Sequence, residues 1–133
     1  MIRTFLDSGV LFTAIRSTDP DKERALCVIA SSERLLITSP FIHLEIMPKA
    51  QYHGNSMEKN FYDAYFRGAE WYEDVDQMLS VVRREAAKCG LSALDALHVA
   101  AAFLAGADEL ITTGKPTKPM FRTKLVNVTY LFH

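Results

Sequence analysis

The sequence predicts an α/β protein with three α/β/α layers around a central, mostly parallel sheet of about five strands. Short apolar runs of strand length alternate with helical patterns along the chain, which is typical of parallel sheets covered on both faces. Prolines at expected helix starts and a glycine at a helix end separate these runs. The 133 residues, nearly half of them apolar, suit a single core, and we expect one domain over residues 1–133.

The first half of the chain predicts two strands separated and followed by helices. Strands are expected at 2–6 and 34–38, and helices at 8–16, 20–32, 40–47 and 56–67. Pro20 suits the first position of the second helix. Ser39 suits an N-cap and Pro40 the position after it, which opens the third helix. Pro48 is expected to end or kink that helix.

The second half predicts three more strands. The elements expected there are a weak strand at 69–73, helices at 73–90 and 93–106, and strands at 108–113 and 125–132. Gly90 is the expected stop of the amphipathic helix before it, and Ser92 the cap of the next. In parallel sheets, sites form beyond the carboxyl ends of strands where the strand order reverses, and Asp7 follows the first strand.

Composition and charge exclude several classes of protein. The formal net charge of −1 excludes a globally basic nucleic-acid binder, although it leaves room for a local basic patch. The sequence has no apolar run near the roughly 20 residues that span a bilayer, and its first residues lack a secretory signal pattern. We therefore expect a cytoplasmic protein without a membrane segment. Cys27 and Cys89 lack CxxC spacing and are expected to be buried, reduced thiols.

Three acids occur near the boundaries of expected elements. Asp7 lies between two apolar runs, and Glu45 lies in a helix with little polar surface, either beside apolar packing or on an exposed stripe. Asp95 follows Ser92 at the spacing of a capping box, so that helix capping competes with catalysis as its role. His98 lies one turn further on the same face, where a hydrogen-bonded core histidine is the favoured interpretation over a ligand.

If these three carboxylates converge, they require a cation. Gathering negative charges is unfavourable without one, and all-oxygen sites suit Mg²⁺ or Mn²⁺. Such ions activate water and stabilise charge on a phosphate group. The sequence pattern alone leaves open whether the acids meet.

Three segments occur along the chain in a specific order: "FLDSGVL", "SPFIHLEIMPKA" and "LSALDALHVAAAFLAGADELITTGKP". In this order and spacing they resemble the PIN domain family of nucleases, and the resemblance spans nearly the whole chain. It implies a compact parallel sheet flanked by helices and a metal-dependent ribonuclease site. Many small members of the family are toxins of VapBC-type toxin–antitoxin pairs, which implies RNA as substrate, an antitoxin as partner and a homodimer.

The resemblance also implies roles for individual residues. Asp7, Glu45 and Asp95 match the acids of the family's metal site. Ser8 matches a hydroxyl position beside the first acid, and Thr112 matches the hydroxyl residue of a late strand; both would position water or phosphate.

The chain departs from the family pattern at Gly114, where an acidic or polar residue is common. A glycine offers no side-chain ligand, so a second metal would be held weakly and activity reduced. Asp108 precedes the strand, and six residues of strand span roughly 20 Å, so it should not substitute. A turn glycine needed for a positive φ is one interpretation of Gly114, and replacement of a catalytic acid is the other.

Two further surfaces suggest binding roles. The segment 114–124 contains Lys115 and Lys118, with Arg122 and Lys124, and either holds RNA phosphates or is a solvated loop. The aromatic residues of 60–72 have helical spacing, so part of them should be core and the rest form a groove for an antitoxin helix or a second copy.

The leading hypothesis is therefore a PIN-type, Mg²⁺- or Mn²⁺-dependent endoribonuclease. The alternative is a catalytically impaired module of the same fold that binds RNA or protein. A phosphatase or response-regulator-like phosphoacceptor fits poorly, because no second acid is adjacent to Asp7.

Overall fold

The structure is a computed structural model that describes residues 1–132, and its centre is a parallel sheet. The described residues form five strands in the order β3-β2-β1-β4-β5, and every neighbouring pair is parallel. Their bounds are β1 Ile2–Leu6, β2 Arg34–Thr38, β3 Glu70–Trp71, β4 Glu109–Thr112 and β5 Val128–Tyr130. The predicted sheet is confirmed, and the strand order reverses at β1 because the chain continues to β2 on one side and returns as β4 on the other.

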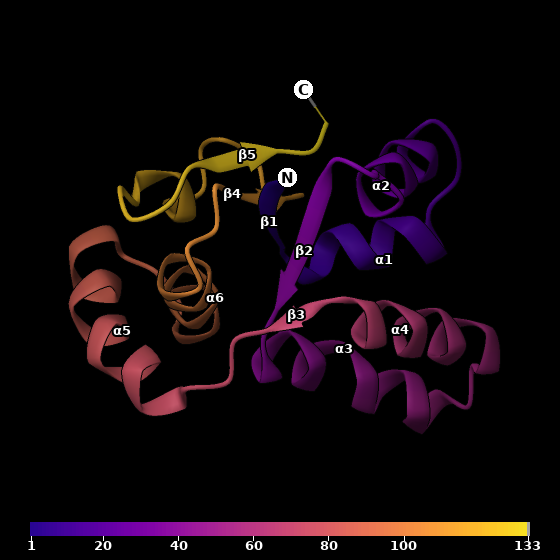
Figure 1. Ribbon diagram of the computed structural model, residues 1–133, viewed down its shortest axis with the longest axis horizontal. Helices are drawn as coiled ribbons and strands as arrows, with labels where there is room; N and C mark the ends of the chain where they lie inside the picture. Colours follow the sequence, from indigo (N-terminus) through magenta and orange to yellow (C-terminus); the bar gives the residue numbers. More distant parts are fainter. Residues whose placement is uncertain (133) are drawn as a thin grey trace.

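Helices cover both faces of this sheet. They are α1 Ser8–Arg16, α2 Asp21–Ile29, α3 Pro40–His53, α4 Ser56–Gly68, α5 Val75–Cys89 and α6 Ala93–Leu104, with a 3₁₀ turn, η1, at Pro119–Arg122. Figure 1 shows α5 and α6 on one side of the sheet and α1 and α2 on the other, with the α3–α4 pair beyond the end of β2. The three-layer α/β/α prediction is therefore confirmed.

The buried core lies between the sheet and the helices that flank it. Phe5 and Leu6 of β1 and Ile37 of β2 are fully buried, as expected for central strands covered on both faces. From the helical layers, Val10 of α1 and Val99 of α6 pack into the same cluster without exposed surface. This packing holds the carboxyl ends of the central strands in place relative to α1, α3 and α6. The residues of the candidate site come from these strand ends and helices.

Two local expectations differ from the structure. Helix α3 continues through Pro48 to His53 and ends at Gly54, which has a φ of 66°. Proline has no backbone N–H, so the hydrogen bond from position 48 to the Leu44 carbonyl is missing. Leu44 is 62% exposed, so water can reach this side of the helix and the helix loses only one bond there. Cys27 is exposed rather than buried, because α2 turns that face to solvent, whereas Cys89 is buried as expected.

A buried acid joins α1 to α4. The Glu58 carboxylate accepts hydrogen bonds from the Tyr62 hydroxyl at 2.5 Å and from Arg16 Nε at 2.8 Å. The same α4 carries most of the aromatic cluster predicted at 60–72. Tyr62, Tyr65 and Phe66 are buried in the core, and Phe61 is the half-buried aromatic residue of α4.

Within residues 1–132, every helix is too short or too polar to cross a lipid bilayer.

Candidate active site

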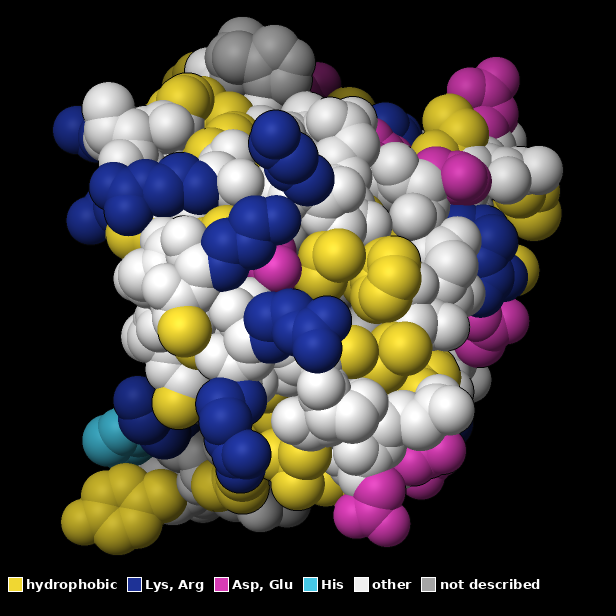
Figure 2. All heavy atoms as spheres, turned by 90° about the vertical axis from the view of Figure 1, so that its left-hand side faces the viewer, with side chains coloured by type: hydrophobic (Ala, Val, Ile, Leu, Met, Phe, Trp, Pro, Cys, Tyr) yellow, Lys and Arg dark blue, Asp and Glu magenta, His cyan; other side chains and the backbone are white. Residues whose placement is uncertain are grey.

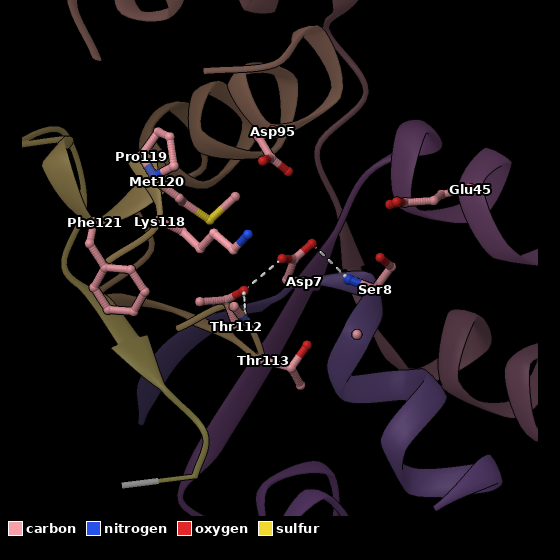
Figure 3. A pocket seen from close by; sticks show the side chains of 12 residues that line it. Asp7, Ser8, Glu45, Asp95, Thr112, Thr113, Lys118, Pro119, Met120 and Phe121 are labelled. Carbon is pink, nitrogen blue, oxygen red and sulfur yellow. Dashed lines mark hydrogen bonds between the residues drawn. The ribbon is translucent and has the colours of Figure 1, made fainter. Parts of the chain in front are cut away.

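A cavity of about 330 Å³ opens at the carboxyl ends of the central strands. It lies where the strand order reverses, at the ends of β1 and β4, and α3 and α6 contribute its other side. The polar residues that line it include Asp7, Ser8, Glu45, Asp95, Thr112 and Lys118. Figure 3 shows that Asp95 and Glu45 extend toward Asp7 from different helices. The three acids singled out in the sequence therefore line one cavity.

Asp7 is held at the junction between β1 and α1. Its carboxylate caps α1 by accepting a hydrogen bond from the Ser8 backbone N–H at 2.9 Å. Its other oxygen accepts from the Thr112 hydroxyl at 2.8 Å, and that hydroxyl in turn accepts from the Gly114 backbone N–H at 3.1 Å. Because the single Thr112 proton is given to Asp7, Thr112 orients this acid in the structure (Figure 3).

Glu45 enters the cavity from the middle of α3. Its side chain is 28% exposed, so it is neither a fully solvated acid nor a core residue. One carboxylate oxygen lies 2.9 Å from Nε2 of His98, a fully buried histidine of α6. The same nitrogen lies 4.0 Å from an Asp7 oxygen. His98 is thus a hydrogen-bonded core histidine, as predicted, but its partner is an acid of the candidate site.

Asp95 contributes to the cap of α6 through its backbone, while its side chain lies at the candidate site. Its backbone N–H donates to the Ser92 hydroxyl at 3.3 Å, which caps α6. Its carboxylate lines the cavity instead of returning to the helix end. Ligand atoms of Asp7, Glu45 and His98 lie within 4.8 Å of one another, and Asp95 is outside that compact group.

Burial and neighbouring polar groups shift the pKa values of two acids of the cavity in opposite directions. Burial raises the pKa of Asp7 and the Asp95 charge raises it further, whereas His98 and the Thr112 hydrogen bond lower it; the net pKa is raised. Burial also raises the pKa of Glu45, but its interaction with His98, a hydrogen bond from Ser8 and the charge of Lys49 outweigh the effect of burial, so the net pKa is lowered.

The residues present fit a divalent cation. Within residues 1–132, Asp7, Glu45 and Asp95 form no ion pair with a lysine or arginine. A cation bound among them would offset both the burial and the Asp95 charge, which together raise the Asp7 pKa. Three carboxylates and two nearby hydroxyls are hard oxygen donors, which suit Mg²⁺ or Mn²⁺.

Gly114 occupies the position where the family pattern often has an acid, and its backbone excludes one of the two interpretations. The positive-φ glycines of the described chain are Gly54, Gly90 and Gly106, so Gly114 is not a turn glycine that needs a positive φ. A Cβ built there would lie 3.4 Å from Thr112 Oγ1 and 3.6 Å from Lys118 Cγ, which are ordinary contacts. The backbone therefore accepts a side chain at this position.

The basic segment 114–124 lies beside the cavity, but Lys115 and Lys118, the two lysines predicted to bind substrate, differ in position. Lys118 lines the cavity, and in Figure 3 its amino group points toward Asp7 and Asp95. Lys115 is exposed and is not among the residues that line the cavity. Arg122 is partly engaged in structure, because it donates to the Cys89 carbonyl at 3.2 Å and ties η1 to the end of α5.

Basic residues continue beyond the loop. Figure 2 shows Lys and Arg side chains gathered on the side of the molecule to which α5 and the segment after β4 belong (compare Figure 1). Exposed basic residues of these two segments are Arg83, Arg84, Lys88, Lys115, Lys118, Arg122 and Lys124. The protein thus has a local basic face, although its net charge is −1.

Comparisons with known proteins identify the fold. No family model matches the sequence, and no curated protein matches it. Among solved structures, a chain of VapBC2 from Rickettsia felis, bound to a DNA fragment from its promoter, has a TM-score of 0.74 at 15% identity; the match covers 97% of this chain and 98% of that one. A toxin–antitoxin complex from Klebsiella pneumoniae gives a TM-score of 0.72 at 17% identity, with the same coverage.

A third solved structure agrees with these two. FitAcB from Neisseria gonorrhoeae gives a TM-score of 0.67 at 19% identity and covers 98% of this chain and 99% of that chain. At such low identities, similarity of structure over the whole length demonstrates the fold and leaves the activity to the residues of the site. The chain has the PIN-like α/β/α fold that it shares with chains of these complexes.

Proposed function

We propose that this protein is a metal-dependent endoribonuclease of the PIN type and the toxin of a toxin–antitoxin pair. The observation that carries the proposal is the meeting of Asp7, Glu45 and Asp95, which come from separate elements, around one cavity. The cavity lies at the reversal of strand order in a PIN-like sheet. The similarity to toxin–antitoxin complexes supports the same function.

Each residue of the cavity has a part in this proposal. Asp7, Glu45 and Asp95 would hold Mg²⁺ or Mn²⁺ through carboxylate oxygens. Such an ion supplies activation of water and neutralisation of charge on a phosphodiester. Thr112 holds Asp7 in place through its hydrogen bond, and the Ser8 hydroxyl gives its proton to Glu45 and keeps lone pairs that would accept a hydrogen bond from water.

The basic residues fit RNA as the substrate. Lys118 has its amino group directed into the cavity, and an ammonium ion there would attract the phosphate next to the cleaved bond. Lys115 and the basic face of α5 would contact neighbouring phosphates outside the cavity. In this proposal, Lys118 binds the substrate at the reacting group, and Lys115 only extends the binding surface.

The proposed partners are an antitoxin protein and a second copy of the chain. An apolar cavity of about 490 Å³ lies between α4 and β2, lined by Phe61, Leu35 and Leu36 and by the buried Tyr65 among others, and we propose it as the partner groove. Apolar side chains exposed elsewhere include Leu44, Leu79 and Phe103. Light scattering of the purified chain measures its oligomeric state, and a monomer at micromolar concentration would contradict the homodimer.

Gly114 favours a second candidate function. Because it supplies no carboxylate where the family pattern has an acidic or polar group, the protein would bind RNA or a protein partner through the same cavity without turnover. This module would keep the basic face and lose the chemistry.

Replacing Asp7 by Asn tests the nuclease. The substitution keeps the shape of the side chain and an oxygen that caps α1, and it removes a charge from the proposed metal site. We expect Mn²⁺-dependent cleavage of single-stranded RNA to fall to background while the circular dichroism spectrum stays unchanged. The matched control is Asp76→Asn, which removes an exposed acid of α5 that does not line the cavity and should cleave like the wild type. Undiminished cleavage by Asp7→Asn would overturn the assignment.

A further inference from the structure

The buried histidine beside the acids has an unusual hydrogen-bonding pattern. His98 is fully buried, and its Nε2 lies 2.9 Å from a Glu45 oxygen. Its other ring nitrogen, Nδ1, is also buried and has no hydrogen-bond partner within residues 1–132. Phe5 lies on one side of the ring, with the two ring centroids 6.1 Å apart. A histidine so close to the proposed metal-binding acids is either a ligand itself or a group that holds a ligand.

The buried Nδ1 without a hydrogen-bond partner decides between these two roles of His98. A histidine that binds a metal through Nε2 must carry its proton on Nδ1, and ligating histidines almost always donate that proton to a partner. Here a proton on Nδ1 would be a buried donor without an acceptor, which is costly. A proton on Nε2 instead makes the 2.9 Å hydrogen bond to Glu45 and leaves Nδ1 as a bare acceptor.

The position of the ring explains what this hydrogen bond does. Glu45 is on a long side chain in the middle of α3, and its carboxylate is only partly buried. His98 is on α6, one turn after Asp95, and is fixed by the core. A donor from α6 therefore determines where the Glu45 carboxylate lies relative to Asp7 and Asp95, and it removes the rotamers in which Glu45 faces solvent.

We propose that His98 is a positioning residue of the metal site, a neutral imidazole that donates Nε2–H to Glu45 and leaves Nδ1 unprotonated. This inference rests on the proposed function, because it concerns the acids that would hold the ion. His98 does not coordinate the ion. In the compact group, Asp7 and Glu45 are then metal ligands, and His98 is the donor that aligns Glu45. The third ligand, Asp95, lies outside this group.

The first experiment measures the tautomer directly. Long-range ¹H–¹⁵N NMR of the metal-free chain, with the His98 signals assigned by their loss in His98→Gln, should show a protonated Nε2 and an unprotonated Nδ1. The same pattern should persist when Mg²⁺ is added. A protonated Nδ1 in the metal-free protein, or loss of the Nε2 proton on adding Mg²⁺, would overturn the proposal.

The second experiment uses variants and Mn²⁺ binding measured by electron paramagnetic resonance. His98→Gln places an amide N–H near the position of Nε2, whereas His98→Asn places it near Nδ1, and His98→Phe keeps a ring with no donor. We expect His98→Gln to bind Mn²⁺ close to wild-type affinity, and His98→Asn and His98→Phe to lose about 10- to 100-fold, as is typical when a group that orients a ligand is removed. Wild-type affinity in His98→Phe would contradict the role, whether or not His98→Asn folds.

The two proposals fail in distinguishable ways. If the wild type binds Mn²⁺ no better than Asp7→Asn, the metal site itself is wrong. The tautomer of the metal-free protein then still decides whether His98 holds Glu45. If the wild type binds Mn²⁺ and Asp7→Asn does not, but Nδ1 carries the proton, the metal site stands and the role of His98 is refuted.

Discussion

Gly9, the second residue of α1, lies against the turn that follows β4, and replacing it by Ala tests this contact. A Cβ at Gly9 would lie 2.0 Å from Thr113 Oγ1, 3.2 Å from Thr113 Cβ and 3.4 Å from its Cγ2. Rotation of the Thr113 side chain moves the oxygen but leaves the Cβ contact tight. The start of α1 must therefore move away from the turn that contains Thr112 and Gly114.

The magnitude follows from two opposing terms. Overpacking of a tight contact costs about 1–3 kcal/mol. Alanine is favoured over glycine in a helix by about 0.5–1 kcal/mol, which offsets part of that cost. We expect Gly9→Ala to lower the free energy of unfolding by about 1–2 kcal/mol, which corresponds to a fall in Tm of roughly 4–8 °C for a chain of this size. Because Asp7 is next to the displaced segment, Mn²⁺ affinity should fall as well.

Urea denaturation followed by circular dichroism measures this loss, and a double-mutant cycle assigns it to Thr113. Removing the Thr113 hydroxyl and methyl with Thr113→Ala should recover part of the loss, with a coupling energy of about 0.5 kcal/mol or more, because the 3.2 Å contact with the Thr113 Cβ remains. Gly68→Ala is the matched control, because nothing lies within 4 Å of a Cβ there. A Gly9→Ala protein as stable as the wild type, or one equally destabilised in both Thr113 backgrounds, would refute the contact.

Two further predictions concern the missing acid and the buried acid. Gly114→Asp should fold within about 1 kcal/mol of the wild type, since its Cβ makes ordinary contacts, and should tighten Mn²⁺ binding by about tenfold. A gain in RNA cleavage would identify an attenuated nuclease, and retained RNA binding without cleavage would identify the binding module. Burial raises the pKa of Glu58, but the Tyr62 and Arg16 hydrogen bonds lower it more, so its net pKa lies below 4.5. Glu58→Gln should therefore cost about 1–3 kcal/mol at pH 7, and this difference should shrink as the pH falls through the lowered pKa below 4.5; a difference independent of pH would contradict the assignment.

Local sequence patterns determined the secondary structure and the order of the layers. Alternation of short apolar runs with helical patterns predicted the parallel sheet, because a strand buried on both faces and a helix buried on one have different periodicities. The caps at Ser39 and Ser92 were also predictable, since their hydroxyls bond to backbone groups only two or three residues away. Short-range chemistry of this kind is fully present in the sequence.

The tertiary structure alone decided which side chains share the cavity. Asp7, Glu45 and Asp95 are distant in sequence, and only the parallel order β2-β1-β4 brings the ends of their elements together. The partner of His98 could not be read from its Ala-rich helix, because Glu45 is 53 residues away. Whether Gly114 needs a positive φ was likewise a property of the folded turn. Contacts between remote residues depend on how the layers pack, and spacing along the chain does not record that packing.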